Sequence, residues 1–289
     1  MSKFTMDVIW GEIELTPLAL KFVDVFEFQR MRHMKQLGPC NFVYSCAETS
    51  RFAHSLGTYH LARRMCLGLK QKYGVDSRTA ELIPIAALYH DIGHGPFSHT
   101  FDRITNSHHE ERSKSILRHV VKKYNIPVTE DEVEFMCQVI DPDEYHKNTS
   151  WQFQIVSGDV DVDRMDYLVR DSNATGVTIT LNPRSVLKII DRVEIKNDRL
   201  YYGDSVWYVI TDLLESRKYM YERVYLHHTA IRIEKLMIQA LARRLRNATK
   251  DIDTFLKFSD SVLQDVYLTG TVEEKEHVDK IFTRRFGDI

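Results

Sequence analysis

The chain has 289 residues, 43% of them hydrophobic and 28% charged, which is enough for one large globular domain. Its formal net charge of -2 and pI near 6.7 argue against a dedicated nucleic-acid binder or a protein of anionic membrane surfaces. The longest apolar runs, such as residues 82–88, are too short for a membrane span, and no signal peptide is recognisable. Four cysteines without CxxC spacing fit reduced thiols. We therefore expect an intracellular protein of the cytoplasm or nucleus, with no membrane partner.

The first predicted element is one long amphipathic helix over residues 17–37. Thr16 and Pro17 supply a cap and a proline at the first helical position, and Gly38 followed by proline ends the helix.

Two more helices are predicted over residues 51–73 and 84–92, after which two glycines and a proline break the chain. A short helix is then expected to begin at Pro96, because Phe97, Phe101 and Ile104 follow a helical core spacing.

The second half of the chain also favours helices. Residues 204–269 contain neither Gly nor Pro and predict two or more long helices. Residues 192–195 and 200–202 predict a strand pair joined by a turn that contains Asn and Asp. With no repeat and no linker, residues 1–289 are interpreted as a single domain, mainly all-α with one small β-hairpin.

A histidine-rich segment is the strongest chemical signal in the sequence. Five of the thirteen histidines lie between His90 and His109, and Asp91 directly follows His90. This density is typical of a metal site with acid/base partners. The alternative is a helix C-terminus that carries histidines because cations are favoured at its negative end.

His99 and Asp102 stand three residues apart and should share one helix face. A carboxylate beside an imidazole fixes the ring's tautomer, as a proton-transferring histidine needs. A surface ion pair is the alternative.

Residues 161–171 form a second polar constellation. In a helix, Asp163, Tyr167 and Asp171 would lie in one stripe, with Arg164 placed to bind phosphate. A solvated charged helix face would give the same pattern. Further on, Arg217, Tyr221, Tyr225 and His228 form a stripe suited to a base-stacking phosphate ligand, although such aromatic residues are more often core.

These motifs resemble a known family. His54, the His90-Asp91 pair and Asp163 resemble the H...HD...D ligands of HD-domain phosphohydrolases. More narrowly, Arg-Phe-Ala-His-Ser-Leu-Gly and His-Asp-Ile-Gly-His-Gly-Pro-Phe-Ser-His-Thr-Phe-Asp resemble the sterile-alpha-motif/HD-domain dNTP triphosphohydrolases and their bacterial and viral relatives. The resemblance runs from about Met6 to the C-terminus and implies the HD-domain helical phosphohydrolase fold.

The resemblance implies metal-dependent hydrolysis of dNTPs at the α-phosphate to a deoxynucleoside and tripolyphosphate. One transition metal (Fe, Mn or Zn) would be held, with Mg on the substrate phosphates. The metal ligands would be His54, His90, Asp91 and Asp163. The catalytic residues would be His99, Asp102, His109, Glu110 and His94, the last at the α-phosphate. The substrate contacts would be Arg51, Arg164, Tyr167 and Arg217 for the triphosphate, Gln36 and Asp171 for the sugar 3'-hydroxyl, and Leu37 and Tyr225 for the base and sugar.

Some positions depart from the family pattern. Arg164 stands where relatives have Lys, and Met6-Asp-Val-Ile-Trp10-Gly replaces Asn-Asp-Pro-Ile-His-Gly. Asp24, Gln29 and Arg32 match the guanine-reading positions of a GTP or dNTP activator site. No sterile-alpha-motif domain precedes the match, and Ile289 falls about where the C-terminal regulatory lobe would begin. We therefore expect a homo-oligomer, with a dimer favoured over an activator-driven tetramer.

Two other functions stay open on the sequence. One is an HD phosphohydrolase that acts on a nucleoside monophosphate, a ribonucleotide or an alarmone. The other is a non-catalytic nucleotide or nucleic-acid binder, which the complete set of motif residues and the near-neutral charge disfavour.

Overall fold

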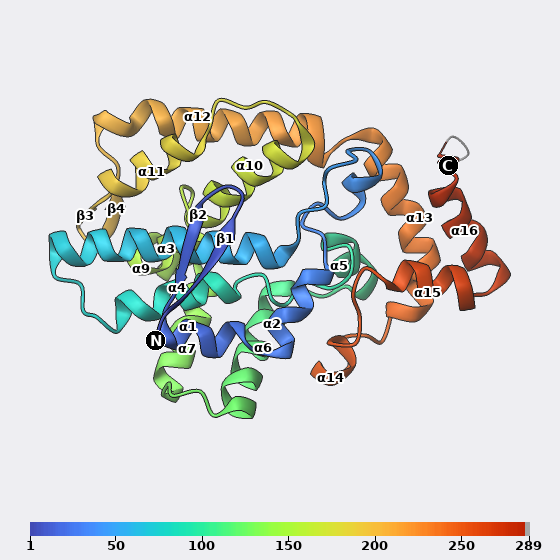
Figure 1. Ribbon diagram of the computed structural model, residues 1–289, viewed down its shortest axis with the longest axis horizontal. Coiled ribbons are helices and arrows are strands. Elements are labelled where there is room, and N and C mark those ends of the chain that lie inside the picture. The colour runs from blue at the N-terminus through green and yellow to red at the C-terminus, as the bar shows by residue number, and fades with distance from the viewer. Residues whose placement is uncertain (287–289) are drawn as a thin grey trace.

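A computed structural model describes residues 1–286, apart from the side chains of residues 144, 147 and 148, and it is built almost wholly from helices (Figure 1). The α-helices are α1 (Pro17–Val23), α2 (Phe26–Gln29), α3 (Arg51–Tyr73), α4 (Thr79–Tyr89), α5 (His99–Thr105), α6 (His109–Tyr124), α7 (Glu130–Ile140), α8 (Glu144–Thr149), α9 (Trp151–Ser157), α10 (Val162–Thr175), α11 (Pro183–Arg192), α12 (Asp204–Met220), α13 (His228–Leu245), α14 (Ile252–Phe255), α15 (Val262–Thr269) and α16 (Val272–Phe282). The predicted all-α class is confirmed.

Helix α3 is the central element of the fold. Ser50 caps its first turn by accepting a hydrogen bond from the amide of Ala53, and Gly74, at φ 70°, ends it in the left-handed region. The helix packs against α4 on one side and against α10 and α11 on the other, as Figure 1 shows. Because α3 is covered on several sides, its apolar and buried polar residues are spread around its circumference.

The helices of the C-terminal region continue the core at one end of the molecule. Helix α13 packs against α16 and also against α5, which comes from the first half of the chain (Figure 1). Helix α12 packs on α10 and α11. The predicted long helices of residues 204–269 are confirmed by α12 and α13, which are joined by a π-helical turn over Tyr221–Tyr225.

The predicted N-terminal helix of residues 17–37 is wrong as one continuous element. Thr16 does cap a helix with Pro17 at its first position, but α1 ends at Val23. Val25 is extended, at φ -123° and ψ 150°, before α2 and a 3-10 turn over Arg30–His33 follow. The β-branched Val25 favours this extended break, and after it Phe28, Met31 and Met34 are buried in the core.

Two further boundaries differ from the sequence prediction. The helix placed over residues 84–92 is α4, which begins at Thr79 and carries Pro84 inside it. The helix expected to begin at Pro96 begins at His99, because Phe97 and Ser98 have φ values of 56° and 58° that a right-handed helix excludes.

Residues 1–286 contain two antiparallel hairpins where one was predicted. The predicted pair is β3 (Glu194–Lys196) with β4 (Arg199–Tyr201), turned by Asn197 and Asp198, both at positive φ. The additional hairpin, β1 (Lys3–Asp7) with β2 (Gly11–Leu15), lies across α3 in Figure 1.

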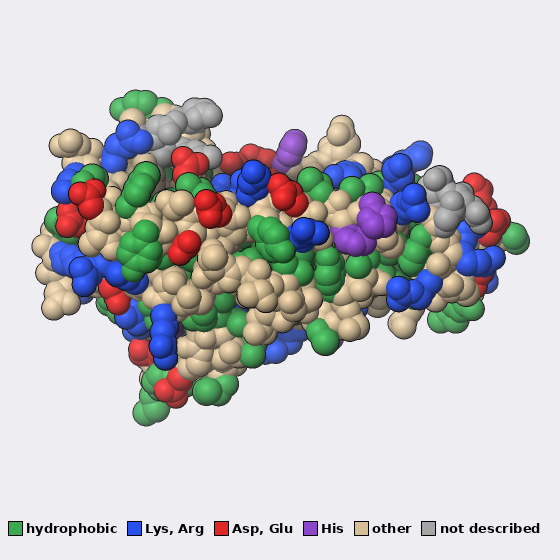
Figure 2. All heavy atoms as spheres, turned by 90° about the horizontal axis from the view of Figure 1, so that it is seen from above, with side chains coloured by type: hydrophobic (Ala, Val, Ile, Leu, Met, Phe, Trp, Pro, Cys, Tyr) green, Lys and Arg blue, Asp and Glu red, His purple; other side chains and the backbone are tan. Residues whose placement is uncertain are grey.

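The surface shows no large area of a single charge in the view of Figure 2, where Lys and Arg are interspersed with Asp and Glu. Among the described residues, no helix combines the length and apolar character needed to cross a bilayer.

Candidate active site

Three side chains from separate helical segments converge inside the molecule. His54 lies on α3, His90 directly follows α4, and Asp163 lies in the first turn of α10. Asp163 Oδ1 is 3.0 Å from Nε2 of His54 and 3.3 Å from Nε2 of His90. Two imidazoles and a carboxylate aimed at one point are a ligand set for a divalent transition metal.

Asp91, the fourth predicted ligand, lies at the edge of this group. Its carboxylate oxygens are 3.5 Å from Nε2 of both His54 and His90, and it forms a close ion pair with Arg51 at the start of α3. Burial raises the pKa of Asp91, but the charges of Arg51 and the nearby imidazoles outweigh burial and hold this pKa well below its usual range. Asp91 is thus a carboxylate placed to share a cation with the other three residues.

The two histidines are oriented through their Nδ1 atoms. His54 Nδ1 is 2.8 Å from Asp166 Oδ2, and His90 Nδ1 is 2.7 Å from the carbonyl oxygen of Ala87. Both Nε2 atoms therefore face the shared centre, and Nε2 of His54 is buried without a well-formed hydrogen bond. Such orientation by a carboxylate or carbonyl is typical of metal-binding histidines, so the residues present fit a metal ion.

Asp166 is held by a buried salt bridge behind the ligands. Arg170 donates to both of its carboxylate oxygens at 2.8 Å, and the two side chains are almost fully buried. Gly57 makes this close approach to α3 feasible, because a Cβ at that position would lie 1.8 Å from Asp166 Oδ1.

The turn of the N-terminal hairpin completes this arrangement. Trp10 donates its indole N–H to Asp166 at 2.5 Å, and Asp7 accepts from Arg170 at 2.9 Å. Sequence reasoning missed all four residues. Asp166 could have been found from its position three residues after Asp163, on the same predicted helix. The contacts of Trp10 and Asp7 depend on tertiary structure and have no such local signal.

A second cluster of titratable side chains lies beside the metal ligands. Asp102 Oδ2 is 3.7 Å from His99 Nδ1 and 3.2 Å from His109 Nδ1, and Arg112 binds the other oxygen. His99 is 70% exposed at its side chain, so this ring faces the pocket described below. Asp102 is therefore hydrogen-bonded to His109 and lies within ion-pair range of His99, the neighbour that the i, i+3 spacing predicts.

His94 and Glu110 complete the predicted catalytic group. The His94 ring stacks on His109 with centroids 3.7 Å apart, and its Nε2 lies 3.4 Å from Asp91 Oδ1. Burial lowers the pKa of His94 well below its usual value, which keeps this imidazole neutral. Glu110 Oε1 lies 3.4 Å from His109 Nε2.

A pocket of about 480 Å³ opens over both clusters. Its lining includes Asp91 and Asp163 from the ligand group and His94, His99 and His109 from the second cluster. All eight side chains predicted to contact substrate line it as well: Gln36, Leu37, Arg51, Arg164, Tyr167, Asp171, Arg217 and Tyr225.

Four buried polar atoms in this pocket have no hydrogen-bond partner within the described chain. They are Gln36 Oε1, His94 Nδ1, Asp171 Oδ1 and Arg217 Nε. Buried polar groups are normally paired, so orphans that share one pocket indicate a polar ligand.

The predicted phosphate-binding arginines differ in their surroundings. Arg164 donates to the carbonyl of Gly158 and pairs with Asp161, the N-cap of its own helix. Arg217 lies over the Tyr221 ring at 4.8 Å and keeps its Nε free of protein partners. Arg217 is thus the cation in the pocket best placed to meet a phosphate.

The predicted activator residues lie near the N-terminus, away from this pocket's lining. Arg32 donates to Gln29 Oε1 at 2.7 Å and stacks on Phe52, and Asp24 pairs with Lys3 at 3.7 Å. An activator site at these residues stays a prediction.

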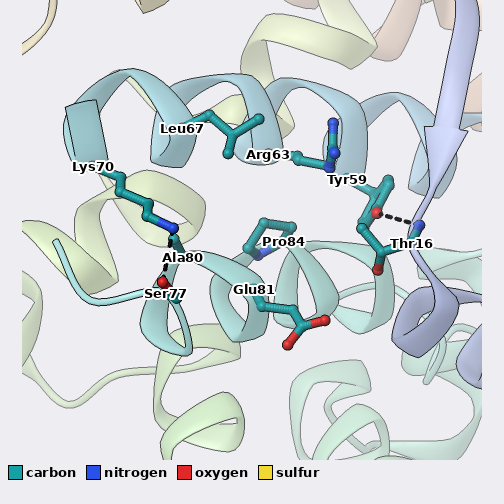
Figure 3. A pocket seen from close by; sticks show the side chains of 9 residues that line it. All are labelled: Thr16, Tyr59, Arg63, Leu67, Lys70, Ser77, Ala80, Glu81 and Pro84. Carbon is teal, nitrogen blue, oxygen red and sulfur yellow. Dashed lines mark hydrogen bonds between the residues drawn. The ribbon is translucent and has the colours of Figure 1, made fainter. Parts of the chain in front are cut away.

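A smaller hollow of about 160 Å³ lies between α3 and α4 (Figure 3). Tyr59, Arg63 and Lys70 approach it from α3, and Lys70 is tied to Ser77 by a hydrogen bond of 2.8 Å. None of the predicted site residues lines this hollow.

Comparison with known proteins gives two family matches, the HD domain over residues 51–171 and the HD associated region over residues 186–286. The deoxynucleoside triphosphate triphosphohydrolase SAMHD1 homolog of Dictyostelium discoideum is 30% identical over 284 residues, covering 92% of this chain and 55% of that protein. Human deoxynucleoside triphosphate triphosphohydrolase SAMHD1 is 28% identical over 315 residues, covering 91% and 50%. An uncharacterized Bacillus subtilis protein, YwfO, is 34% identical over 224 residues, covering 75% and 50%.

The chain thus spans about half the length of these curated relatives. The matched HD domain contains His54, the His90-Asp91 pair and Asp163, the same residues that converge in the structure. The chain therefore belongs to the HD-domain family, with an HD-associated region, and most of its length is similar to SAMHD1-type dNTP triphosphohydrolases.

Proposed function

We propose that this chain hydrolyses deoxynucleoside triphosphates at the α-phosphate, releasing a deoxynucleoside and tripolyphosphate. One observation carries the proposal: a single pocket joins a metal-ligand group, a histidine-carboxylate cluster and four unpaired polar atoms. The Dictyostelium and human relatives are named as deoxynucleoside triphosphate triphosphohydrolases, which supports the choice of substrate.

The ligand group would hold one divalent transition metal, Fe, Mn or Zn, through His54, His90, Asp91 and Asp163. When bound, such an ion supplies a water of lowered pKa and polarises a phosphoryl oxygen. The chain itself orients the ligands, because Asp166 fixes the His54 ring and the Ala87 carbonyl fixes the His90 ring.

The second cluster would transfer the proton that the leaving group needs. Water adds to the α-phosphorus, the bond from phosphorus to the sugar O5' breaks, and O5' leaves with a proton. His99 lines the pocket with the Asp102 carboxylate 3.7 Å from its Nδ1, so it is placed to donate that proton. The neutral ring of His94, between Asp91 and His109, would contact the α-phosphate.

The far side of the pocket would bind the rest of the nucleotide. Arg217 and Arg164 offset the triphosphate charge, with Mg²⁺ on the phosphates, and the unpaired Nε of Arg217 supplies a free donor. Gln36 Oε1 and Asp171 Oδ1 have no protein partner and can hydrogen-bond a sugar hydroxyl. Tyr225, which donates to Asp171 at 2.9 Å, packs beside them.

Substrate choice is tested by a panel assay on the purified chain with Mn²⁺. The panel holds the four dNTPs, the four NTPs, deoxynucleoside monophosphates and a guanosine alarmone, and products are separated by anion exchange. The proposal expects tripolyphosphate from dNTPs. Turnover of monophosphates or alarmone alone, with dNTPs untouched, would replace the proposal with another HD phosphohydrolase activity.

A further inference from the structure

The loop between the metal ligands and His99 has a backbone that needs outside support. Phe97 and Ser98, the two residues before His99, both have φ near 57°, a region that non-glycine residues rarely occupy. A backbone of this kind persists only where surrounding groups fix it. The direction in which His99 leaves the loop depends on these two residues.

Asp260, which follows α14 in the HD-associated region, fixes this loop. Its Oδ1 accepts the backbone N–H of Phe97 and its Oδ2 accepts the backbone N–H of Lys35, both at 2.8 Å. Lys35 directly precedes Gln36 and Leu37, which line the substrate pocket. One carboxylate therefore joins the acid/base loop to the substrate-binding turn.

Two other side chains reinforce the junction. Ser98 donates to the Lys35 carbonyl at 3.3 Å and accepts from Arg51 at 2.8 Å. Buried Arg30 donates to the carbonyls of Ile92 and His94 at 3.1 and 3.0 Å. It also donates to the Phe258 carbonyl at 3.0 Å, two residues before Asp260.

Helix α13 of the same region holds the helix that carries His99. Glu234 accepts from Thr100 at 3.2 Å and from Arg103 at 2.6 Å, both in α5. The HD-associated region thus reaches the acid/base residues at two places, through Asp260 before His99 and through Glu234 after it.

We propose that Asp260 is a positioning residue, through which the HD-associated region sets the geometry of His99 and of the Gln36–Leu37 turn. The role of Asp260 in turnover rests on the proposed function, whereas its hydrogen bonds to Phe97 and Lys35 do not. Only an acceptor with two oxygens satisfies both N–H groups at once. An asparagine would set its own N–H₂ against one of them and leave that donor unpaired.

The test compares Asp260→Asn with Asp260→Glu, which keeps both oxygens, and with Asp253→Asn, an exposed position in α14. Turnover is measured per bound Mn²⁺ on dNTPs and on bis(p-nitrophenyl) phosphate, and bound Mn²⁺ is counted by isothermal titration calorimetry. Dividing by bound metal removes any contribution from misfolded protein. Hydrogen exchange of the Lys35 and Phe97 amides is measured on the same samples by NMR.

For Asp260→Asn we expect kcat per bound metal to fall at least about tenfold, since misplacing a catalytic group by 1 Å lowers the rate about 10²-fold. KM for dNTP should rise as well, exchange at Lys35 or Phe97 should accelerate, and Mn²⁺ affinity should stay unchanged. Asp260→Glu should recover part of the loss, and Asp253→Asn should behave as wild type.

Wild-type kcat per metal and unchanged exchange in both Asp260 variants would overturn the inference while leaving the proposed function intact. If Asp260→Asn does not fold, Asp260→Glu carries the test, with kcat expected below wild type. If the wild type cleaves bis(p-nitrophenyl) phosphate but no dNTP, the proposed function fails, and the positioning role is decided on the diester.

Discussion

Replacing Asp171 by asparagine should make the stability of the protein depend less on pH. Asp171 is 2% exposed; its Oδ2 accepts the Tyr225 hydroxyl at 2.9 Å, and its Oδ1 has no partner. Burial raises the pKa of this carboxyl from 3.8 to about 7, although the Tyr225 hydroxyl and nearby positive charges partly counter burial. The folded protein therefore holds a proton at Asp171 that the unfolded chain releases.

The direction and size of this pH dependence of stability follow from proton linkage. Because the folded pKa is above the unfolded value, wild-type stability falls as pH rises from about 4 to about 7. Between pH 5 and pH 8, about two pH units of this window are crossed, which corresponds to about 2–3 kcal/mol at about 1.4 kcal/mol per unit. The asparagine side chain does not titrate, so this loss is absent in the variant.

Urea unfolding followed by circular dichroism, in EDTA at pH 5 and pH 8, measures the effect. The asparagine amide leaves a donor beside the former Oδ1, which costs about 1–3 kcal/mol at either pH. That cost cancels when the two pH values are compared. We expect Asp171→Asn to gain about 2–3 kcal/mol relative to wild type on going from pH 5 to pH 8. An equal stability difference at both pH values would refute the reasoning.

Three other substitutions, one of them with a matched control, probe the site and its support. Trp10→Phe removes the hydrogen bond to Asp166 and should weaken Mn²⁺ binding about tenfold by calorimetry; an unchanged Kd would show that the hairpin does not support the ligands. Gly57→Ala puts a methyl group 1.8 Å from Asp166 Oδ1 and should lower the free energy of unfolding by about 2–3 kcal/mol. Gly68→Ala on the same helix, where nothing lies within 4 Å, should instead be neutral or raise it by up to about 1 kcal/mol; equal effects of the two substitutions would contradict the packing argument. Arg217→Gln should raise KM for dNTP about tenfold or more and leave bis(p-nitrophenyl) phosphate hydrolysis unchanged, whereas equal losses on both substrates would place Arg217 at the reacting phosphate.

The elements with local signals were predictable from the sequence. Ser50 and Gly74 mark the ends of α3, and Asp161 caps α10 by accepting from the amide of Arg164. These signals act within one helical turn, so composition and spacing suffice to read them. The histidine and aspartate motifs are also local, although their convergence was expected only from the family resemblance.

The features that sequence reasoning missed depend on distant contacts. Phe97 and Ser98 adopt positive φ while Asp260, far along the chain, accepts the Phe97 amide. The position of Trp10 is fixed by the Asp166 carboxylate, which lies 156 residues away. No periodicity in the sequence encodes such pairs. The break near Val25 had a weak local signal, because the apolar spacing of residues 17–37 continues across it.

Hydrolysis of dNTP in H₂¹⁸O tests the central claim most directly. The purified chain with Mn²⁺ and Mg²⁺ is incubated with each dNTP, and both products are analysed by mass spectrometry. Attack of water at the α-phosphorus predicts one ¹⁸O in tripolyphosphate and none in the deoxynucleoside, with activity abolished by EDTA and by His90→Ala. Parallel reactions with GTP test whether Asp24, Gln29 and Arg32 form an activator site. Release of pyrophosphate and a deoxynucleoside monophosphate, or no turnover by protein with bound metal, would contradict the account.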